Sequence, residues 1–184
     1  IDKVSQIRRY ALENGFSIVA SSDWHERKDV EIQDEPDFKE TFPPHCMANE
    51  KGSQRVGYLG NLPISHIPVS PLEKHDLLGF IEPEQFHIQI LKKETDVFSN
   101  ENTAKILELI KPRKVIVFGI ALDVCVEQTV YGLIDHNIEE VIVLTDAVKG
   151  LGIKPDEEVY ENFRRTGVVL SEFDPVKLKG LIKV

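Results

Sequence analysis

The sequence has few of the features that mark membrane, secreted or nucleotide-binding proteins. It contains two cysteines in 184 residues, Cys46 and Cys125, which are too few for a disulfide scaffold and typical of a reducing compartment. No apolar run approaches the roughly 20 residues that cross a bilayer, and no signal-peptide pattern or Gly-rich phosphate loop is visible. We therefore expect a cytoplasmic protein without a membrane partner.

Positive charge is also scarce. Lys and Arg number 22 against 31 Asp and Glu, and the resulting net charge of -9 opposes binding to nucleic acid or to an anionic membrane. Hydrophobic residues (41%) and charged residues (29%) are in the usual range for a globular protein, and a chain of this length can bury a substantial core. We predict one domain over residues 1–184 with a small-molecule partner, and leave self-association into a homo-oligomer open.

Short apolar runs alternate with amphipathic segments along most of the chain. This alternation predicts βαβ units, and hence an α/β, Rossmann-like, three-layer domain with a mainly parallel central sheet. Residues 26–84 break the alternation; they are rich in Pro and charge, and we expect long loops with one or two short helices there. Strands are expected over 16–21, 86–91, 114–118, 140–145 and 167–170, and helices over 1–14, 101–110, 123–136, 155–164 and 174–180.

The segment FGIALDVCVEQTV (118–130) predicts a strand, a tight turn and a helix that begins near Asp123 as its N-cap. Cys125 would then lie in the first turn of the helix, where free N–H groups and the helix dipole favour a thiolate and could hold an oxyanion. Ligands bind at this edge of an open parallel sheet. The alternative is a buried structural cysteine, since free Cys is among the most buried residue types.

Two further segments carry potential metal ligands: SSDWH (21–25), which ends a predicted strand, and FPPHC (42–46). Asp23, His25 and His45 form a carboxylate and two imidazoles, a set that suits Zn²⁺, Mn²⁺ or Fe²⁺ with open positions for water or substrate. Pro43 and Pro44 restrict the backbone before His45 and could fix its direction. The alternative is that Asp23 caps a turn and the histidines are polar loop residues.

A lysine pair follows the strand at 86–91, in the segment QILKKETDVFSN (89–100). A Lys at this strand end could share a sheet edge with Cys125 and lower the pKa of its thiol by charge. Lys92 lies on the same side of the strand as Ile88 and Ile90, so we favour it over Lys93. Without a partner, such a pair is ordinary solvated surface.

Together these segments resemble the isochorismatase-like cysteine hydrolases, and within them the nicotinamidase branch. SSDWH resembles the D-W-H metal motif of that branch, FPPHC its W-P-x-H-C motif, and GIALDVCVEQTV its G-x-A-T-D-x-C-V-x-x-T nucleophile turn. The segment that contains Lys92 looks like the strand of the catalytic lysine. The resemblance implies one divalent metal ion, Zn or Mn/Fe, on Asp23, His25 and His45, with Cys125 as the nucleophile and Lys92 as the catalytic lysine.

The resemblance also implies a reaction. The backbone N–H groups of Leu122 and Cys125 would form the oxyanion hole, Phe42 stands where many members have a substrate-stacking Trp, and Trp24 and Phe98 are further predicted substrate contacts. The expected reaction is hydrolysis of nicotinamide to nicotinate and ammonia through a thioester, a step of NAD salvage. The alternatives are another small-amide or carbamoyl C–N hydrolase, and a non-catalytic metal-binding protein.

The sequence departs from the family pattern at several points. Leu122 replaces the usual Thr, HCMANEKG (45–52) replaces H-C-V-Q-G-T-x-G, and residues 60–84 match no family segment. The family's cis peptide falls at Ala121–Leu122. The third member of the family triad, an Asp on a strand before the first helix, has no counterpart, because Asp2 lies in that helix. We therefore expect the natural chain to have roughly 20 to 30 more N-terminal residues, with an apolar strand that ends in this Asp.

Overall fold

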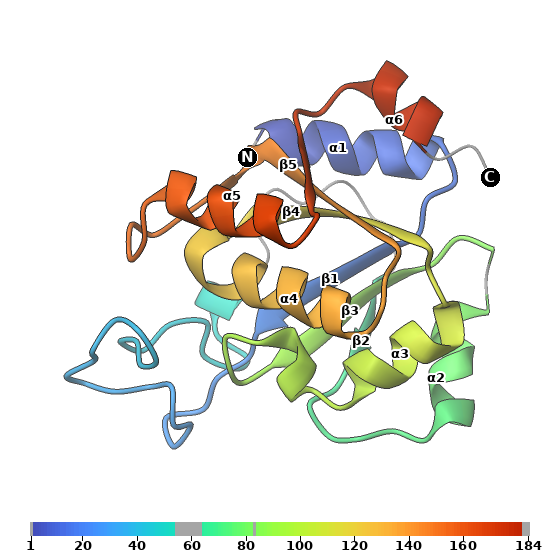
Figure 1. The fold of residues 1–184 in the computed structure, drawn as a ribbon. Coiled ribbons are helices and arrows are strands. Elements are labelled where there is room, and N and C mark those ends of the chain that lie inside the picture. Colours follow the sequence, from blue (N-terminus) through green and yellow to red (C-terminus); the bar gives the residue numbers. More distant parts are fainter. Residues whose placement is uncertain (1, 54–63, 83, 182–184) are drawn as a thin grey trace. The chain divides into compact units, whose positions relative to one another are not determined.

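The computed structural model describes residues 2–53, 64–82 and 84–181. The chain forms two compact units, one made of Ile1–Tyr10 and Lys111–Val184 and the other of Ala11–Ile110. We call them the C-terminal unit and the N-terminal unit. Each contains helices and a parallel sheet (Figure 1), which confirms the predicted α/β class. Within the described ranges, no helix is long and apolar enough to cross a membrane.

The N-terminal unit contains a sheet of three parallel strands in the order β1-β3-β2. In its register, Asp23 at the end of β1 pairs with Lys92 at the end of β3. Two of these strands were predicted, but each runs further toward its carboxyl end than expected, so both residues belong to strands rather than to loops. The three-residue β2 was not predicted. The strands are β1 (Ile18–Asp23), β2 (Ser65–Ile67) and β3 (His87–Lys92).

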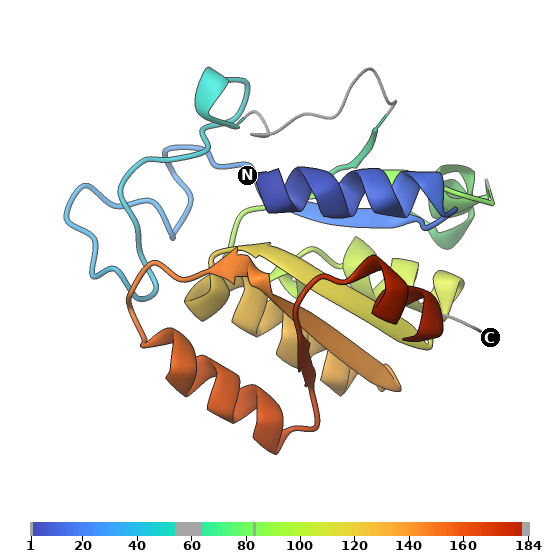
Figure 2. The ribbon, with the colours of Figure 1, turned by 90° about the horizontal axis from the view of Figure 1, so that it is seen from above.

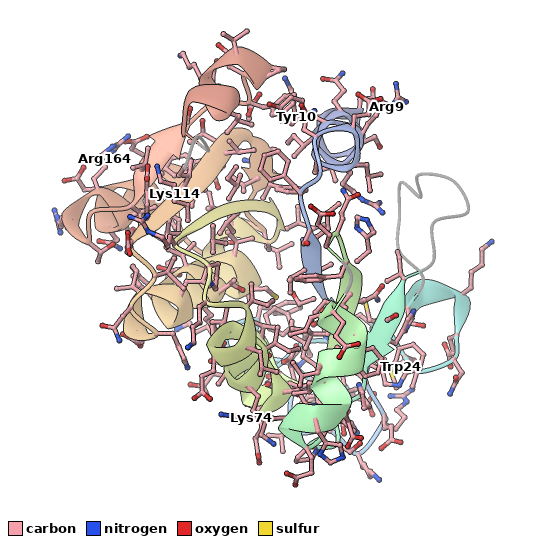
Figure 3. The ribbon with its side chains drawn as sticks, turned by 90° about the vertical axis from the view of Figure 1, so that its right-hand side faces the viewer. Arg9, Tyr10, Trp24, Lys74, Lys114 and Arg164 are labelled. Atoms are coloured by element: carbon pink, nitrogen blue, oxygen red, sulfur yellow. The ribbon has the colours of Figure 1, made fainter. Side chains whose placement is uncertain are left out.

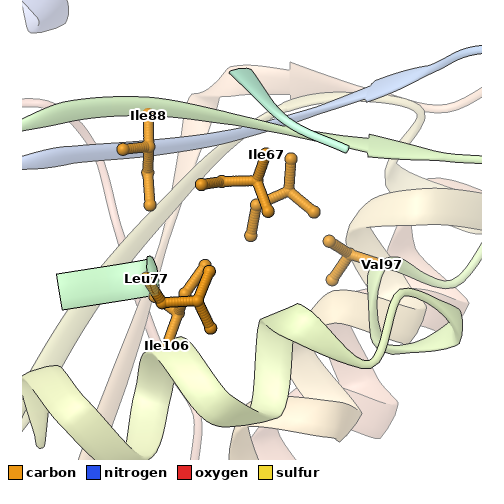
Figure 4. Packing of buried hydrophobic residues seen from close by; sticks show 6 residues of the cluster. Ile67, Leu77, Ile88, Val97 and Ile106 are labelled. Carbon is orange, nitrogen blue, oxygen red and sulfur yellow. The ribbon is translucent and has the colours of Figure 1, made fainter. Parts of the chain in front are cut away.

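The core of the N-terminal unit lies between this sheet and its helices. β3 is the central strand, and its residues from Ile88 to Lys92 are all buried, as expected for a parallel strand covered on both faces. Figure 4 shows Ile88 and Ile67 from the strands facing Leu77 and Ile106 from the helices. The helices and 3₁₀ turns of this unit are η1 (Lys51–Ser53), α2 (Lys74–Ile81), η2 (Val97–Ser99) and α3 (Asn102–Ile110).

The substitution Ile90→Ala is expected to destabilise the protein by about 2–5 kcal/mol, because it removes buried methyl groups and leaves a cavity. Ile90 is 1% exposed and belongs to the cluster of Figure 4. Urea unfolding gives the free-energy difference. The control Val30→Ala, at a side chain that is 84% exposed, is expected to change stability by less than about 0.5 kcal/mol. Equal losses in the two variants would contradict the assigned core.

The C-terminal unit contains a second parallel sheet in the order β4-β5-β6. On one face, Ile7 of the first helix packs with Ile142, Leu144 and Ala147. Figure 2 shows α4 and α5 on the other side of β4 and β5. All seven elements were predicted from the hydrophobic pattern, with shifted bounds for both strands and helices. The elements are α1 (Asp2–Glu13), β4 (Lys114–Ile120), α4 (Glu127–Asp135), β5 (Glu140–Lys149), α5 (Asp156–Arg165), β6 (Val169–Ser171) and α6 (Pro175–Leu181).

Candidate metal centre and nucleophile turn

Asp23, His25 and His45 converge at the carboxyl end of β1. One donor atom from each residue lies within 4.8 Å of the others. His45 Nε2 is 3.9 Å from Asp23 Oδ2, and the two imidazole rings are 4.6 Å apart between centroids. The structure therefore brings together the three residues that the sequence predicts as metal ligands.

Backbone pairing explains why the two histidines meet. His25 forms a parallel bridge with Met47, in which its N–H donates to the Cys46 carbonyl (3.1 Å) and its own carbonyl accepts from the Ala48 N–H (2.8 Å). This bridge closes an excursion of the chain, residues 26–44, at its base. The long loop of residues 26–44 therefore begins and ends beside the carboxyl end of β1, which brings His45 close to His25.

A second bridge crosses the excursion. Ile32 pairs with Phe42, with hydrogen bonds from the Phe42 N–H to the Glu31 carbonyl (2.7 Å) and from the Gln33 N–H to the Phe42 carbonyl (3.0 Å). At the tip, the Asp37 carboxylate accepts hydrogen bonds from three backbone N–H groups, those of Lys39, Glu40 and Thr41. The excursion is therefore an ordered ladder with a capped tip.

The second bridge places Glu31 beside the two histidines. Glu31 Oε1 is 3.6 Å from His25 Nε2 and 3.8 Å from His45 Nε2, and the residue is 6% exposed. Burial raises the pKa of Glu31 to about 7. The sequence analysis did not identify Glu31, because it lies in a charge-rich loop and only the Ile32–Phe42 pairing turns it inward. Glu31 is a candidate fourth ligand.

The ring direction of His45 is set by the backbone carbonyl of Pro43, two residues earlier. Its Nδ1 lies 2.9 Å from the Pro43 carbonyl oxygen. A carbonyl only accepts hydrogen bonds, so Nδ1 is the donor, and in the neutral tautomer it is Nε2, on the side of Asp23 and Glu31, that has the lone pair. This is the arrangement in which a neutral imidazole binds a metal ion.

His25 provides the clearest test of whether a metal ion fits. It is 0% exposed, and neither of its ring nitrogens has a hydrogen-bond partner among the described residues. Burial lowers the pKa of His25, which favours the neutral ring. A buried polar atom without a partner is costly. Coordination of a divalent cation removes this cost, and a donor set of imidazoles and carboxylates suits Zn²⁺, Mn²⁺ or Fe²⁺.

Lys92 extends this site from the neighbouring strand. Its ammonium donates to the Asp23 carboxylate and to the Glu94 carbonyl (2.8 Å), and the residue is 2% exposed. Lys93 instead points to the other side and forms ion pairs with Glu26 (3.0 Å) and Asp29 (2.9 Å). The pleat of β3 thus sends Lys92, which the sequence favoured, into the interior.

Asp29 lies behind His25. Its Oδ2 is 3.8 Å from His25 Nδ1 and accepts a hydrogen bond from the Glu26 N–H (2.8 Å), while its Oδ1 binds Lys93 (2.9 Å). Histidine ligands commonly have a carboxylate beside the ring nitrogen that does not bind the metal, because it fixes the tautomer and the ring orientation. We therefore predict that Asp29, which is held by Lys93, orients the His25 ring rather than binding the ion.

The substitution Asp29→Asn is accordingly expected to weaken metal binding by about 10-fold or more. Titration calorimetry of the metal-free protein with Zn²⁺ measures the change. Glu26→Gln is the matched control, because Glu26 binds the same lysine from a position that is half exposed. We expect unchanged affinity in the control; an equal loss in both variants would mean that Lys93, not Asp29, is the important group.

The predicted aromatic contacts differ in their surroundings. Phe42 is buried and lies edge-on to His45, with 6.0 Å between ring centroids. Trp24, which is labelled in Figure 3, follows β1 directly and is half-buried. Its backbone N–H donates to the Lys92 carbonyl. Phe98 is half-buried and packs against the hydrophobic core of the N-terminal unit. Their roles in substrate binding stay predictions.

Cys125 belongs to the C-terminal unit, in the turn between β4 and α4. The predicted helix 123–136 begins instead with a π-helical turn, η3 (Leu122–Val126), in which the Ala121 carbonyl accepts from the N–H groups of Val124 (3.2 Å) and Val126 (3.0 Å). Such turns are frequent at functional sites. Cys125 is half-buried and Leu122 is fully buried.

Three expectations for this turn are wrong. β4 continues past Phe118 to Ile120, and the cis peptide joins Ile120 to Ala121 rather than Ala121 to Leu122. Asp123 does not cap its own helix, because its carboxylate accepts hydrogen bonds from backbone N–H groups of the loop after β5. A local capping rule could not reveal partners so distant in the sequence.

The sequence profile of the isochorismatase domain matches residues 11–173, which is most of the chain. The chain belongs to the isochorismatase family. This family assignment confirms the resemblance stated from the motifs and identifies the protein as an isochorismatase-family hydrolase. No protein of curated function gives a significant match to the sequence.

Solved structures agree with the family assignment. The pyrazinamidase of Pyrococcus horikoshii in complex with zinc is 26% identical, with a TM-score of 0.67 over 94% of this chain and 84% of that chain. The nicotinamidase of Bacillus subtilis is 18% identical (TM-score 0.68, 93% and 83%). The N-carbamoylsarcosine amidase of Thermoplasma acidophilum is 20% identical (TM-score 0.66, 93% and 80%). At these low identities, the likeness to the last two structures supports the fold of this chain alone.

Proposed function

We propose that the protein hydrolyses the C–N bond of a small amide, and that nicotinamide is the favoured substrate. The observation that carries this proposal is the buried, unpartnered imidazole of His25 beside Asp23 and His45, a donor set that calls for a metal ion. The likeness to a zinc-bound pyrazinamidase and the strand–turn–helix setting of Cys125 support it further. A pyrazine or pyridine ring with a carboxamide is the chemistry that this likeness suggests.

In the proposed mechanism, the Cys125 thiolate attacks the amide carbonyl carbon and the carbonyl π electrons move to oxygen. The backbone N–H groups of Leu122 and Cys125 stabilise this oxyanion. When the tetrahedral intermediate collapses, the C–N bond breaks and the amine takes up a proton to leave as ammonia. Water then cleaves the thioester, which releases the carboxylic acid, the thiolate and one proton, and this proton balances the one that the departing ammonia took up.

Other residues position the reacting groups. Asp23, His25 and His45, with Glu31 as a fourth donor, would hold one divalent ion. When bound, this ion supplies a coordination site for a ring nitrogen and for water, and thereby orients the substrate. Lys92 holds the Asp23 carboxylate, and as the proposed catalytic lysine its positive charge favours anionic states of the reacting groups.

Ammonia release from a panel of small amides tests the proposal. The metal-loaded protein is incubated with nicotinamide, pyrazinamide, a simple aliphatic amide and an N-carbamoyl amino acid. We expect ammonia and nicotinate in equal amounts from nicotinamide. Release from the carbamoyl compound alone would instead establish a carbamoyl C–N hydrolase. No release from any compound, despite full metal loading, would reject catalysis and favour a metal-binding protein.

A further inference from the structure

Asp123 is a buried carboxylate in the same turn as Cys125, and it binds a loop from another part of the unit. It is 4% exposed. Its Oδ1 accepts from the Leu151 N–H (2.8 Å), and its Oδ2 accepts from the N–H groups of Gly152 (2.9 Å), Ile153 (2.8 Å) and Lys154 (3.2 Å). Four successive backbone amides thus surround one side chain.

The turn that carries Cys125 has no capping side chain at its N-terminus. Ala121, at the N-cap of η3, makes no side-chain capping hydrogen bond, and neither does Val126, at the N-cap of α4. Downstream, the Thr129 hydroxyl donates to the Cys125 carbonyl (2.7 Å) and fixes that side of the turn. The four hydrogen bonds of Asp123 anchor the upstream side of the turn.

The loop of residues 150–154 fits closely around this anchor. Lys154 reaches back to Glu127, the first residue of α4, with 2.6 Å between Nζ and Oε2, and Glu127 is 6% exposed. At Gly150 an added Cβ would lie 2.6 Å from Asp156 Oδ1 and 3.1 Å from Asp123 Cγ, so a side chain there would crowd the carboxylates of both residues. The loop therefore touches both ends of η3.

The negative charge of Asp123 is not expected to activate the Cys125 thiol. A negative charge in the same turn disfavours a thiolate and so raises the pKa of a cysteine. Burial raises the pKa of Asp123, but the hydrogen bonds from the loop amides outweigh it and lower that pKa overall, so the carboxylate is ionised. We therefore expect Asp123 to act by fixing the position of the turn that carries Cys125. Misplacement of a reacting group by about 1 Å can lower the rate 10²-fold.

We propose that Asp123 is a positioning residue, whose carboxylate fixes the turn that presents Cys125 by binding the backbone amides of residues 151–154. This inference rests on the proposed role of Cys125 as the nucleophile. Asp123 need not touch the substrate, because it acts through the turn.

The test compares Asp123→Asn with Asp146→Asn in the metal-loaded protein. Asp146 is a matched control: it also lies in the C-terminal unit, accepts a backbone N–H (Phe173, 2.9 Å) and pairs with a lysine (Lys3, 2.9 Å). For Asp123→Asn we expect kcat to fall by about 10²-fold with KM nearly unchanged. The pH profile of Cys125 alkylation by iodoacetamide should show a thiol pKa that is equal to or lower than in wild type. Asp146→Asn should keep kcat.

Two results would overturn the inference. One is a kcat for Asp123→Asn that is no lower than for Asp146→Asn. The other is a rise in the thiol pKa large enough to account for the lost rate, which would make the role of Asp123 electrostatic. An inactive wild-type protein rejects the proposed function instead. In that case amide hydrogen exchange of residues 121–127 decides: faster exchange in Asp123→Asn alone supports the anchor, and unchanged exchange rejects it.

Gly150→Ala provides a second variant in case Asp123→Asn fails to fold. The added methyl group changes the loop, and no residue of the turn itself is substituted. We expect the same pattern of lower kcat, nearly unchanged KM and unchanged thiol pKa. Full activity in a folded Gly150→Ala protein, with the loop amides still protected from exchange, would show that the contact tolerates displacement and would reject a close positioning role.

Discussion

The Cys125→Ser protein is expected to lose ammonia release by on the order of 10³-fold or more, with its metal content unchanged. A serine hydroxyl in this position has no base of its own and stays protonated near neutral pH, whereas a thiol at the start of a helix ionises readily. Cys125 lies in η3, which directly follows β4, and we propose its sulfur as the nucleophile. Steady-state ammonia assays with nicotinamide measure the loss.

Cys46→Ser is the matched control, because Cys46 is the other cysteine of the chain and is likewise half-buried. It follows His45 in a left-handed backbone conformation, with φ of 44°, and we assign it no step of the reaction. The control should keep its activity, and iodoacetamide should label Cys125 first across pH 5 to 9. Preferential labelling of Cys46, together with an inactive Cys46→Ser protein, would reverse the assignment of the nucleophile.

His45→Ala should weaken binding of Zn²⁺ or Mn²⁺ by on the order of 10²-fold or more, because it removes a predicted direct ligand rather than a supporting group. The side chain of His45 is 33% exposed, so its loss leaves no buried cavity of note. Its Nε2 faces both carboxylates of the site, Asp23 and Glu31. Activity should fall in parallel, and excess metal should restore part of it.

Metal-dependent stabilisation gives an independent measurement. A ligand at 100 times its Kd adds about 2.7 kcal/mol to the free energy of unfolding. Wild type should show this gain in urea unfolding with added Zn²⁺, and His45→Ala should show almost none at the same concentration. His66→Ala is the control, since His66 is an exposed imidazole on β2 of the same unit. Wild-type affinity in His45→Ala would show that the metal site is misassigned.

Part of the candidate metal centre could be predicted because Asp23 and His25 lie at and just after a strand end. Asp23 and His25 come directly after an apolar run, and the strand pleat alone distinguishes Lys92 from Lys93. Glu31 escaped prediction because its approach depends on one bridge, Ile32 with Phe42, inside a loop that has no periodic pattern. Isolated bridges of this kind depend on tertiary packing, which a reading of local propensity cannot supply.

The nucleophile turn shows a different limit. The strand–turn–helix pattern correctly placed Cys125 after β4, but it predicted a regular helix with Asp123 as its cap. The π-helical start and the four amides that bind Asp123 depend on a loop that enters after β5, far along the chain. The short β2 was missed for a related reason: three residues are too few to show an alternating pattern.

The ladder in residues 26–44 has a consequence for how this enzyme could diversify. The candidate ligand His25 lies in the bridge with Met47 at the base of this segment, and Glu31 lies beside the Ile32–Phe42 bridge, whereas the capped tip around Asp37 contributes no candidate donor atom. Changes of length confined to residues 34–40 would leave both bridges paired, since longer surface loops cost little extra closure entropy. The tip is thus a segment that evolution or an engineer can rewrite for a new substrate while the inherited coordination chemistry is retained.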